Sequence, residues 1–197
     1  MNYLAHLYLA GPCTDLVIGG FIGDSVRGRM FDQLPSKIQH GVRLHREIDR
    51  FTDQHPVVKR SVSRMRKRFG RYAAVVADVF YDHFLARDFH DYHDQPLADF
   101  ATSVAALLAP NLVALPERSH RFYHYMVTNN VLMSYAKIDG IAQVLTRMAH
   151  RARFVSHMEQ AGSELELHYR AYDADFKEFF PAVCAFAHAA RAQLGFD

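Results

Sequence analysis

Three side chains able to bind a metal ion recur at four-residue steps in the segment GVRLHREIDRFTDQHP: His45, Asp49 and Asp53. Residues four apart stack on one face of an α-helix, so an imidazole and two carboxylates would share one stripe. Such a stripe offers nitrogen and oxygen ligands to a divalent cation. The alternative is an ordinary helix surface, on which Asp49 pairs with Arg46 and Asp53 with Arg50. The spacing alone leaves both interpretations open.

More residues that could do chemistry lie in apolar helical surroundings within the first 90 positions. They are His6, Asp24, Asp78, Asp82 and His83. A carboxylate there is costly unless it is paired or bound to a metal, and a cation would hold converging carboxylates together. A mixed His/Asp site suits Mn²⁺, Fe²⁺ or Zn²⁺, with Mg²⁺ where oxygens predominate. Plainer roles stay open, with His6 as a hydrogen-bonded histidine and Asp78 as a helix cap.

The elements that must position these residues are predicted to be helices, because a period of 3.6 residues dominates the chain and no segment alternates like a strand. Pro110 and Pro116 frame a loop, and the last helix begins at Ser163 with a bend near Pro181. The sequence thus predicts one all-α domain over residues 1–197, a helical bundle. The expected helices before the last one cover residues 2–10, 16–30, 34–54, 57–69, 71–89, 96 onward, 121–135 and 138–152.

Composition fits an ordinary globular protein. The 197 residues are 50% hydrophobic and 22% charged, with a formal net charge of +2, so a single core can form without disulfide staples. Cys13 and Cys184, the two cysteines, form neither a disulfide framework nor a zinc-ribbon spacing. The apolar start lacks a basic region before it, and no run of about 20 apolar residues occurs. We therefore expect a cytoplasmic protein that does not enter membranes.

The segment from Lys59 to Arg71, KRSVSRMRKRFGR, is rich in cations and contains no acid. Arg60, Arg64 and Arg68 recur every four residues and would form one cationic ridge along a helix. The apolar stripe on the opposite side would anchor this helix to the core; it consists of Val58, Val62, Met65 and Phe69. A solvated basic face is one interpretation, and a docking surface for an anionic partner is the other.

Four ordered blocks, MNYLAHLYLA, GGFIGDSVRG, GVRLHREIDRFTDQHP and VFYDHFLARDF, resemble those of the bacterial acyl carrier protein phosphodiesterases, also called holo-ACP hydrolases. Together they span most of residues 1–90, and RFYHYM and LELHYRAYDADFKEFFP resemble the same family less distinctively. The resemblance implies an all-helical, atypical member of the HD phosphohydrolase superfamily that uses a divalent metal, usually manganese. Its implied substrate is the 4′-phosphopantetheine arm on a serine of holo-acyl carrier protein.

The resemblance and the residues together suggest roles within the cluster. We expect Asp24, His45, Asp49 and His83 to bind the metal, with Asp82 and His6 next. Catalytic support would come from four further residues: Asp53 or Asp78 would orient a ligand or move a proton, and Arg27 or Arg46 would clamp the phosphate. The usual HD signature is an adjacent His-Asp pair, whereas the adjacent pair here is reversed, Asp82-His83. Ligand roles therefore cannot be copied from ordinary HD enzymes.

The same resemblance gives the basic segment Lys59–Arg71 a partner, because carrier proteins are acidic and would dock on a basic surface near the catalytic mouth. Two other functions stay open. An HD-type nucleotide phosphohydrolase would keep the metal and change the substrate, although no feature of the sequence reads a base. A non-enzymatic helical protein could grip nucleic acid through the basic segment, but that reading leaves the buried acids unexplained. We favour the carrier protein and expect no nucleic-acid partner.

Overall fold

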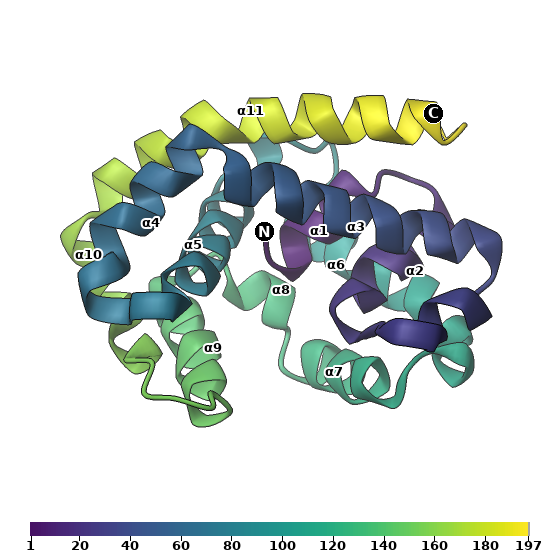
Figure 1. Ribbon diagram of the computed structural model, residues 1–197, viewed down its shortest axis with the longest axis horizontal. Coiled ribbons are helices and arrows are strands. Elements are labelled where there is room, and N and C mark those ends of the chain that lie inside the picture. The colour runs from purple at the N-terminus through teal and green to yellow at the C-terminus, as the bar shows by residue number, and fades with distance from the viewer. Residues whose placement is uncertain (197) are drawn as a thin grey trace.

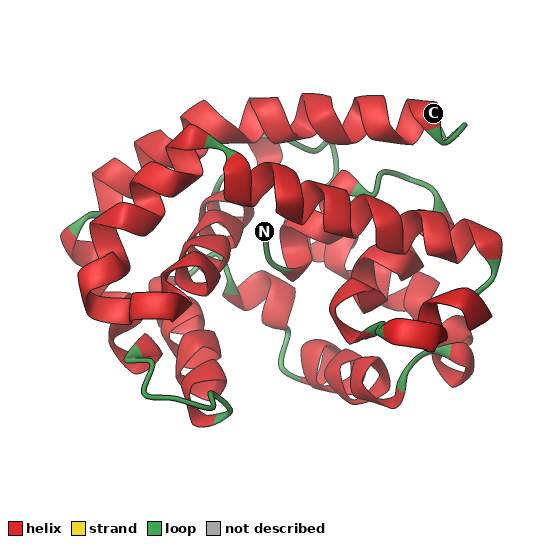
Figure 2. Cartoon of the chain, viewed as in Figure 1, coloured by secondary structure: helices red, strands yellow, loops and turns green. Residues whose placement is uncertain are grey.

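Helices form where apolar residues recur with helical spacing, and they end at glycine, proline or a left-handed residue. The structure is a computed structural model that describes residues 1–196. Within that range there is no β-strand (Figure 2), which confirms the predicted all-α class. The α-helices are α1 Tyr3–Leu9, α2 Thr14–Ile22, α3 Ser36–Gln54, α4 Pro56–Phe69, α5 Ala73–Arg87, α6 Leu97–Leu108, α7 Glu117–Thr128, α8 Val131–Ser134, α9 Ile138–His150, α10 Ala161–Leu167 and α11 Tyr169–Gln193.

Short 3₁₀ helices join several of these elements, and two of them replace segments predicted otherwise. The helix expected over 16–30 ends at Ile22 and continues as η1 Gly23–Ser25 and η2 Gly28–Gln33, because Val26 and Arg27 are extended and Gly28 has φ +53°. The loop expected between Pro110 and Pro116 is largely η5 Ala109–Ala114. The others are η3 Gly70–Tyr72, η4 Phe89–Asp91 and η6 Met158–Gln160.

Two further predicted helices are interrupted. The helix expected over 121–135 is broken into α7 and α8, because Asn130 adopts a left-handed conformation with φ +47°. The long C-terminal helix is divided into α10 and α11 at His168, and Pro181 lies inside α11 without ending it. Other boundaries agree with expectation, including the stop of α4 at Gly70, which has φ +53°. None of the described helices is long and apolar enough to cross a bilayer.

The core lies around α5, which is buried on nearly every side. Phe80, Tyr81 and Phe84 of α5 pack edge-on or tilted against aromatic rings of α11 such as Tyr172 and Phe176. Figure 1 shows α11 and α3 running side by side across the top of the molecule, with the N-terminus and α1 in the middle. Helix α1 packs against α2, α5 and α11, and its buried His6 reaches Asp49 of α3.

Candidate metal centre

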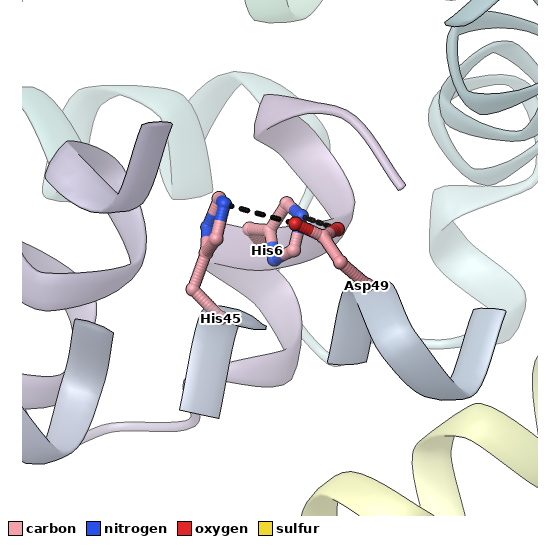
Figure 3. A group of neighbouring side chains, drawn as sticks. All are labelled: His6, His45 and Asp49. Atoms are coloured by element: carbon pink, nitrogen blue, oxygen red, sulfur yellow. Dashed lines mark hydrogen bonds and ion pairs between the residues drawn. The ribbon is translucent and has the colours of Figure 1, made fainter. Parts of the chain in front are cut away.

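His6 of α1 and the pair His45 and Asp49 of α3 meet in one cluster (Figure 3). It is the group of metal-binding type found within residues 1–196, and one ligand atom of each residue lies within 4.8 Å of the others. Asp49 Oδ1 is 3.0 Å from His6 Nε2, and Asp49 Oδ2 is 3.3 Å from His45 Nε2. The two imidazole rings stack at a centroid distance of 3.7 Å. The predicted stripe of His45 and Asp49 thus faces one site.

Close helix packing explains why α3 presents these residues to α1. Helices α2 and α3 touch at Gly19 and Gly41, where a Cβ built on Gly19 would lie 2.5 Å from the Gly41 Cα. Gly23 leaves room for the His45 ring in the same way, because a Cβ at this position would lie 2.4 Å from His45 Cγ. Side chains at these positions would separate the helices or displace the ring, so the glycines shape the site.

One nitrogen of each histidine is set apart for the cluster. His45 Nδ1 lies 2.9 Å from the Gly20 carbonyl oxygen and must donate to it, which in the neutral ring leaves the lone pair on Nε2. A backbone carbonyl behind a histidine is the usual support of a metal ligand. His6 Nδ1 is buried without a hydrogen-bond partner, whereas its Nε2 faces Asp49 and the Met1 carbonyl oxygen. His45 Nε2 is therefore a candidate ligand atom, and His6 Nε2 becomes one when it carries no proton.

The electrostatics of the cluster are those of a cation site. Burial and the neighbouring His45 lower the pKa of His6 to about 4. Burial would also lower the pKa of His45, but the carboxylates of Asp24 and Asp49 outweigh it and raise the pKa to about 9. Burial alone would raise the pKa of Asp49, yet the contacts with His45 and His6 hold that pKa well below its ordinary value. A positive charge therefore stabilises the carboxylates of Asp24 and Asp49, and either a protonated His45 or a metal ion can supply it.

Asp24 lies at the open edge of the cluster. Its Oδ1 is 3.6 Å from His45 Nε2, and its side chain is 61% exposed. The contact with His45 is the main reason that the pKa of Asp24 is lowered. Two imidazole nitrogens and carboxylate oxygens form a donor set that fits a divalent ion such as Mn²⁺, Fe²⁺ or Zn²⁺.

Asp82 and His83, which were expected among the ligands from the sequence, do not belong to this cluster. Asp82 accepts backbone hydrogen bonds from Leu4 at 2.7 Å and from Asn2 and Ala5 at 3.3 Å, so it caps the first turn of α1. Burial raises the pKa of Asp82 to about 7. Both nitrogens of His83 are used elsewhere, Nδ1 by the Tyr135 carbonyl at 2.7 Å and Nε2 by the Tyr169 hydroxyl at 2.8 Å.

The predicted supporting residues lie at different distances from the cluster. Asp78 Oδ1 accepts a hydrogen bond of 2.9 Å from the Met1 ammonium group, which is 3.7 Å from Asp49 Oδ1. Burial outweighs this ammonium group and raises the pKa of Asp78. Asp53 is exposed one turn beyond Asp49 on α3. The side chain of Asp53 has no hydrogen bond or ion pair to another residue of the described chain.

The two predicted phosphate-clamping arginines flank the segment that carries Asp24. Arg46 donates a 3.0 Å hydrogen bond to the Val26 carbonyl and lies over the Phe31 ring at 5.2 Å. Arg27 is exposed in the extended stretch between η1 and η2. Arg46 therefore fixes this segment against α3, while the Arg27 side chain projects from it. The sequence pattern gave no hint of the roles of the Gly20 carbonyl and of Gly23, which only the close approach of α2 and α3 reveals.

The cationic ridge of α4 forms, but acids of the same chain neutralise it. Arg60 and Arg64 bind Asp175 of α11 with N–O distances of 2.6 and 2.7 Å, and Arg60 also binds Glu178. Arg68 lies 3.1 Å from Glu164 of α10. The ridge thus joins α4 to its neighbours through ion pairs within the chain.

Comparison with known proteins identifies the relationship. The profile of the family described as "Acyl carrier protein phosphodiesterase" matches residues 1–183. The chain belongs to this family. A relative of that name from Pectobacterium atrosepticum is 32% identical over 188 residues, 95% of this chain and 97% of the relative. One from Yersinia enterocolitica is 32% identical, covering 93% of this chain and 95% of the relative, and one from Escherichia coli O157:H7 is 31% identical, covering 94% and 96%. No solved structure matches the chain.

The acyl carrier protein phosphodiesterase family match covers every residue of the cluster. The resemblance predicted from the four sequence blocks is therefore confirmed, and the chain is a phosphodiesterase by family. The cluster of His6, His45 and Asp49 is consistent with a divalent metal.

Proposed function

We propose that this protein hydrolyses the phosphodiester that joins 4′-phosphopantetheine to a serine of holo-acyl carrier protein. Water forms a bond to phosphorus, the bond from phosphorus to the serine oxygen breaks, and that oxygen takes up a proton. The products are the apo carrier protein and 4′-phosphopantetheine. The observation that carries the proposal is the His6–His45–Asp49 cluster in a chain of the acyl carrier protein phosphodiesterase family.

In this proposal a divalent cation is held by His6, His45 and Asp49, and Asp24 completes the set at the open edge. Mn²⁺ is our first choice, with Mg²⁺ and Fe²⁺ as alternatives, because the donors are both nitrogen and oxygen. When bound, such a cation acidifies a water molecule and neutralises charge on the phosphate. The similarity to HD phosphohydrolases remains part of the proposal.

The residues around the cluster would perform the remaining steps. His45 is held in one orientation by the Gly20 carbonyl, so its Nε2 always faces the site. Arg27, which projects from the segment beside Asp24, would bind the nonbridging phosphate oxygens, and Arg46 would keep that segment in place. Asp53 is free to move a proton between solvent and substrate, while Asp78 would position Asp49 through the Met1 ammonium group.

The partner is the carrier protein, and the basic helix α4 stays its proposed docking element. Because Arg60, Arg64 and Arg68 are paired, this role falls to the exposed cations Lys59, Arg66 and Lys67 of α4 and to Arg71 of η3, which follows it. These cations do not contact the phosphorus. Their attraction for the acidic carrier protein would raise the association rate, and salt would screen it. A cytoplasmic location and the lack of a nucleic-acid partner remain predictions.

Mass spectrometry tests the function directly. Purified holo-acyl carrier protein incubated with the enzyme and Mn²⁺ should lose the mass of the phosphopantetheine group. Asp49→Asn should slow this loss by at least about 100-fold, since a ligand is removed. Asp139→Asn, the same change at an exposed site on α9, should not slow it. Asp53→Asn should keep bound manganese and lower kcat.

Two results would contradict the proposal. An intact carrier protein after prolonged incubation with Mn²⁺-loaded enzyme would refute the activity. Faster turnover of any member of a nucleotide panel would favour the nucleotide phosphohydrolase instead.

A further inference from the structure

An exposed aromatic residue is held in place just after α9. Phe154 and Val155, in the segment between α9 and η6, are 51% and 82% exposed. Two guanidinium groups lie over the Phe154 ring, that of Arg71 at 4.3 Å and that of Arg153 at 5.5 Å from its centroid. Its backbone N–H donates to the Tyr72 hydroxyl at 3.3 Å. This apolar surface is therefore built and fixed, although nothing in the described chain covers it.

Shallow hollows flank the exposed pair on both sides. One, of about 370 Å³, opens toward the end of α4 beside Lys67 and Arg71. The other, of about 240 Å³, lies toward α9 beside His150. A projecting aromatic residue between two hollows gives a partner both an apolar anchor and space for its own side chains.

Exposed cations lie in the same region of the chain as this apolar pair or over its ring. Arg71, Arg147, Arg151 and Arg153 are all exposed, and none forms an ion pair with a carboxylate of residues 1–196. They differ in this from the ridge of α4, whose arginines are paired. Arg147 is stacked over Tyr125 at 4.6 Å, which fixes its position without neutralising its charge. These four arginines thus have their charges available, and Glu159, beside His157 in the hollow toward α9, is an acid close to them.

The same surface approaches the start of α1, the helix that carries His6. Arg147 and Arg151 border a small hollow of about 40 Å³ together with Asn2 and Tyr3 of the α1 region, and α1 carries His6. Burial and the Asp24 carboxylate raise the pKa of Tyr3 to about 12, and Arg151 opposes that rise. Tyr3 therefore lies within electrostatic reach of both Asp24 and Arg151. Arg147 and Arg151 thus lie beside the first residues of the chain, while Lys67 and Arg71 lie beside Phe154.

We propose that holo-acyl carrier protein docks on the surface formed by Arg71, Arg147, Arg151, Arg153, Phe154 and Val155, which adjoins the C-terminal end of the basic segment Lys59–Arg71. This inference rests on the proposed function. The scissile phosphate is bonded directly to a serine of the carrier, so the carrier's own surface must come against the edge of the metal centre. Exposed arginines then meet its acidic side chains, and Phe154 supplies the apolar anchor.

Two pairs of variants test the docking surface, one apolar and one charged. Phe154→Ser with Val155→Ser, and Arg147→Glu with Arg151→Glu, should each raise KM for holo-acyl carrier protein about tenfold and leave kcat within twofold. High salt should shrink the effect of the charge reversals, since it screens the wild-type attraction. Hydrolysis of bis(p-nitrophenyl) phosphate, a small diester that needs no docking, should be unchanged.

Matched controls alter the same chemistry elsewhere. Val113→Ser changes an apolar residue that is 94% exposed, and Lys37→Glu with Arg170→Glu reverses two exposed charges. Both controls should keep the wild-type KM. Because the charged pair leaves the apolar residues intact, it decides the question even where the apolar pair fails to fold.

The outcomes separate the two proposals. If the unsubstituted enzyme releases no phosphopantetheine, the proposed function falls and the docking surface with it. If it does, but both surface variants keep the wild-type KM, the docking inference alone is overturned. It is also overturned if sedimentation shows a dimer that the Phe154 and Val155 substitutions dissociate, because the surface would then join two copies of this chain.

Discussion

His45 has its two nitrogens committed in opposite directions. Nδ1 faces the Gly20 carbonyl at 2.9 Å, and Nε2 faces Asp49 at 3.3 Å and Asp24 at 3.6 Å. The ring can adopt this position because Gly23 has no side chain beside it. The geometry of the cluster therefore depends on a residue that makes no polar contact with it.

Gly23→Ala should damage the metal centre more than the fold. Gly23 has φ −47° and ψ −46°, which alanine adopts without strain, so the cost falls on the His45 ring that the new Cβ would meet at 2.4 Å. We expect Mn²⁺ affinity to fall at least about tenfold, by analogy with loss of other supporting groups. Calorimetric titration with Mn²⁺ measures this.

The control for this change is Gly20→Ala, whose Cβ would lie 3.4 Å from the His6 carbonyl oxygen and should be tolerated. Wild-type affinity in Gly23→Ala would mean that the His45 ring can shift without loss of the site.

Residue spacing predicted that His45 and Asp49 share one face, but it could not predict which partner the buried Asp82 would find. The four-residue step of His45 and Asp49 specifies a common face on any helix. The acid Asp82 was assigned to the metal because a buried carboxylate needs a partner. The backbone N–H groups of Leu4, Asn2 and Ala5 satisfy that need equally well. A sequence shows that a partner is required but does not show which one.

At the scale of elements, α4 is joined to α11 by a buried acid. Asp175 accepts hydrogen bonds from Ser61 at 2.6 Å and from Arg60 and Arg64 at 2.7 Å. The ridge predicted along α4 is therefore real, and its spacing was read correctly. Spacing gives the face that residues share, whereas the packing of α4 on α11 decides what that face meets.

Asp175→Asn should destabilise the protein by about 2–3 kcal/mol, because hydrogen bonds between charged groups are lost at a site that is 2% exposed. Glu178→Gln, which alters the exposed partner of Arg60, should cost less than about 1 kcal/mol. Urea unfolding at neutral pH measures both. Equal losses would show that burial of Asp175 adds nothing to its ion pairs.

Acid should reduce the difference in the free energy of unfolding between wild type and Asp175→Asn. Burial alone would raise the pKa of Asp175, but hydrogen bonds from Ser61, Arg64 and Arg60 outweigh it and lower the pKa. A carboxyl group with a lowered folded-state pKa stabilises the protein above its unfolded pKa of about 4, and loses that effect as pH falls through the folded value. The unfolding difference should therefore shrink only below about pH 4.

Helix ends, like side-chain partners, were predicted only in part from the sequence. Gly70 ends α4 as expected, since its φ of +53° suits glycine. The break at Asn130 was missed, because asparagine accepts a left-handed conformation without requiring one. The apolar residues keep their helical spacing through such a residue. A single sequence therefore predicts the apolar face of the helix but not the break in it.

At the scale of the whole molecule, the metal centre ties distant parts of the chain together. His6 and Asp49 are 43 residues apart, and Asp82 reaches back over 78 residues to the first turn of α1. The all-α class follows from periodicity alone, but such long-range pairings follow from how helices pack. Because the ligands come from α1 and α3, an ion bound there would hold two helices in their folded arrangement.

A metal ion that binds the folded chain and not the unfolded one should raise its melting temperature. At a free Mn²⁺ concentration 100 times the dissociation constant, the gain is about 2.7 kcal/mol. For a chain of this size that corresponds to a rise of roughly 5–10 °C. A chelator should reverse the rise and abolish activity while the helical circular dichroism remains, because hydrogen bonds within the cluster persist without metal. Asp49→Asn should lose the rise and Asp139→Asn should keep it. An equal rise in Asp49→Asn would place the bound ion outside the cluster of His6, His45 and Asp49.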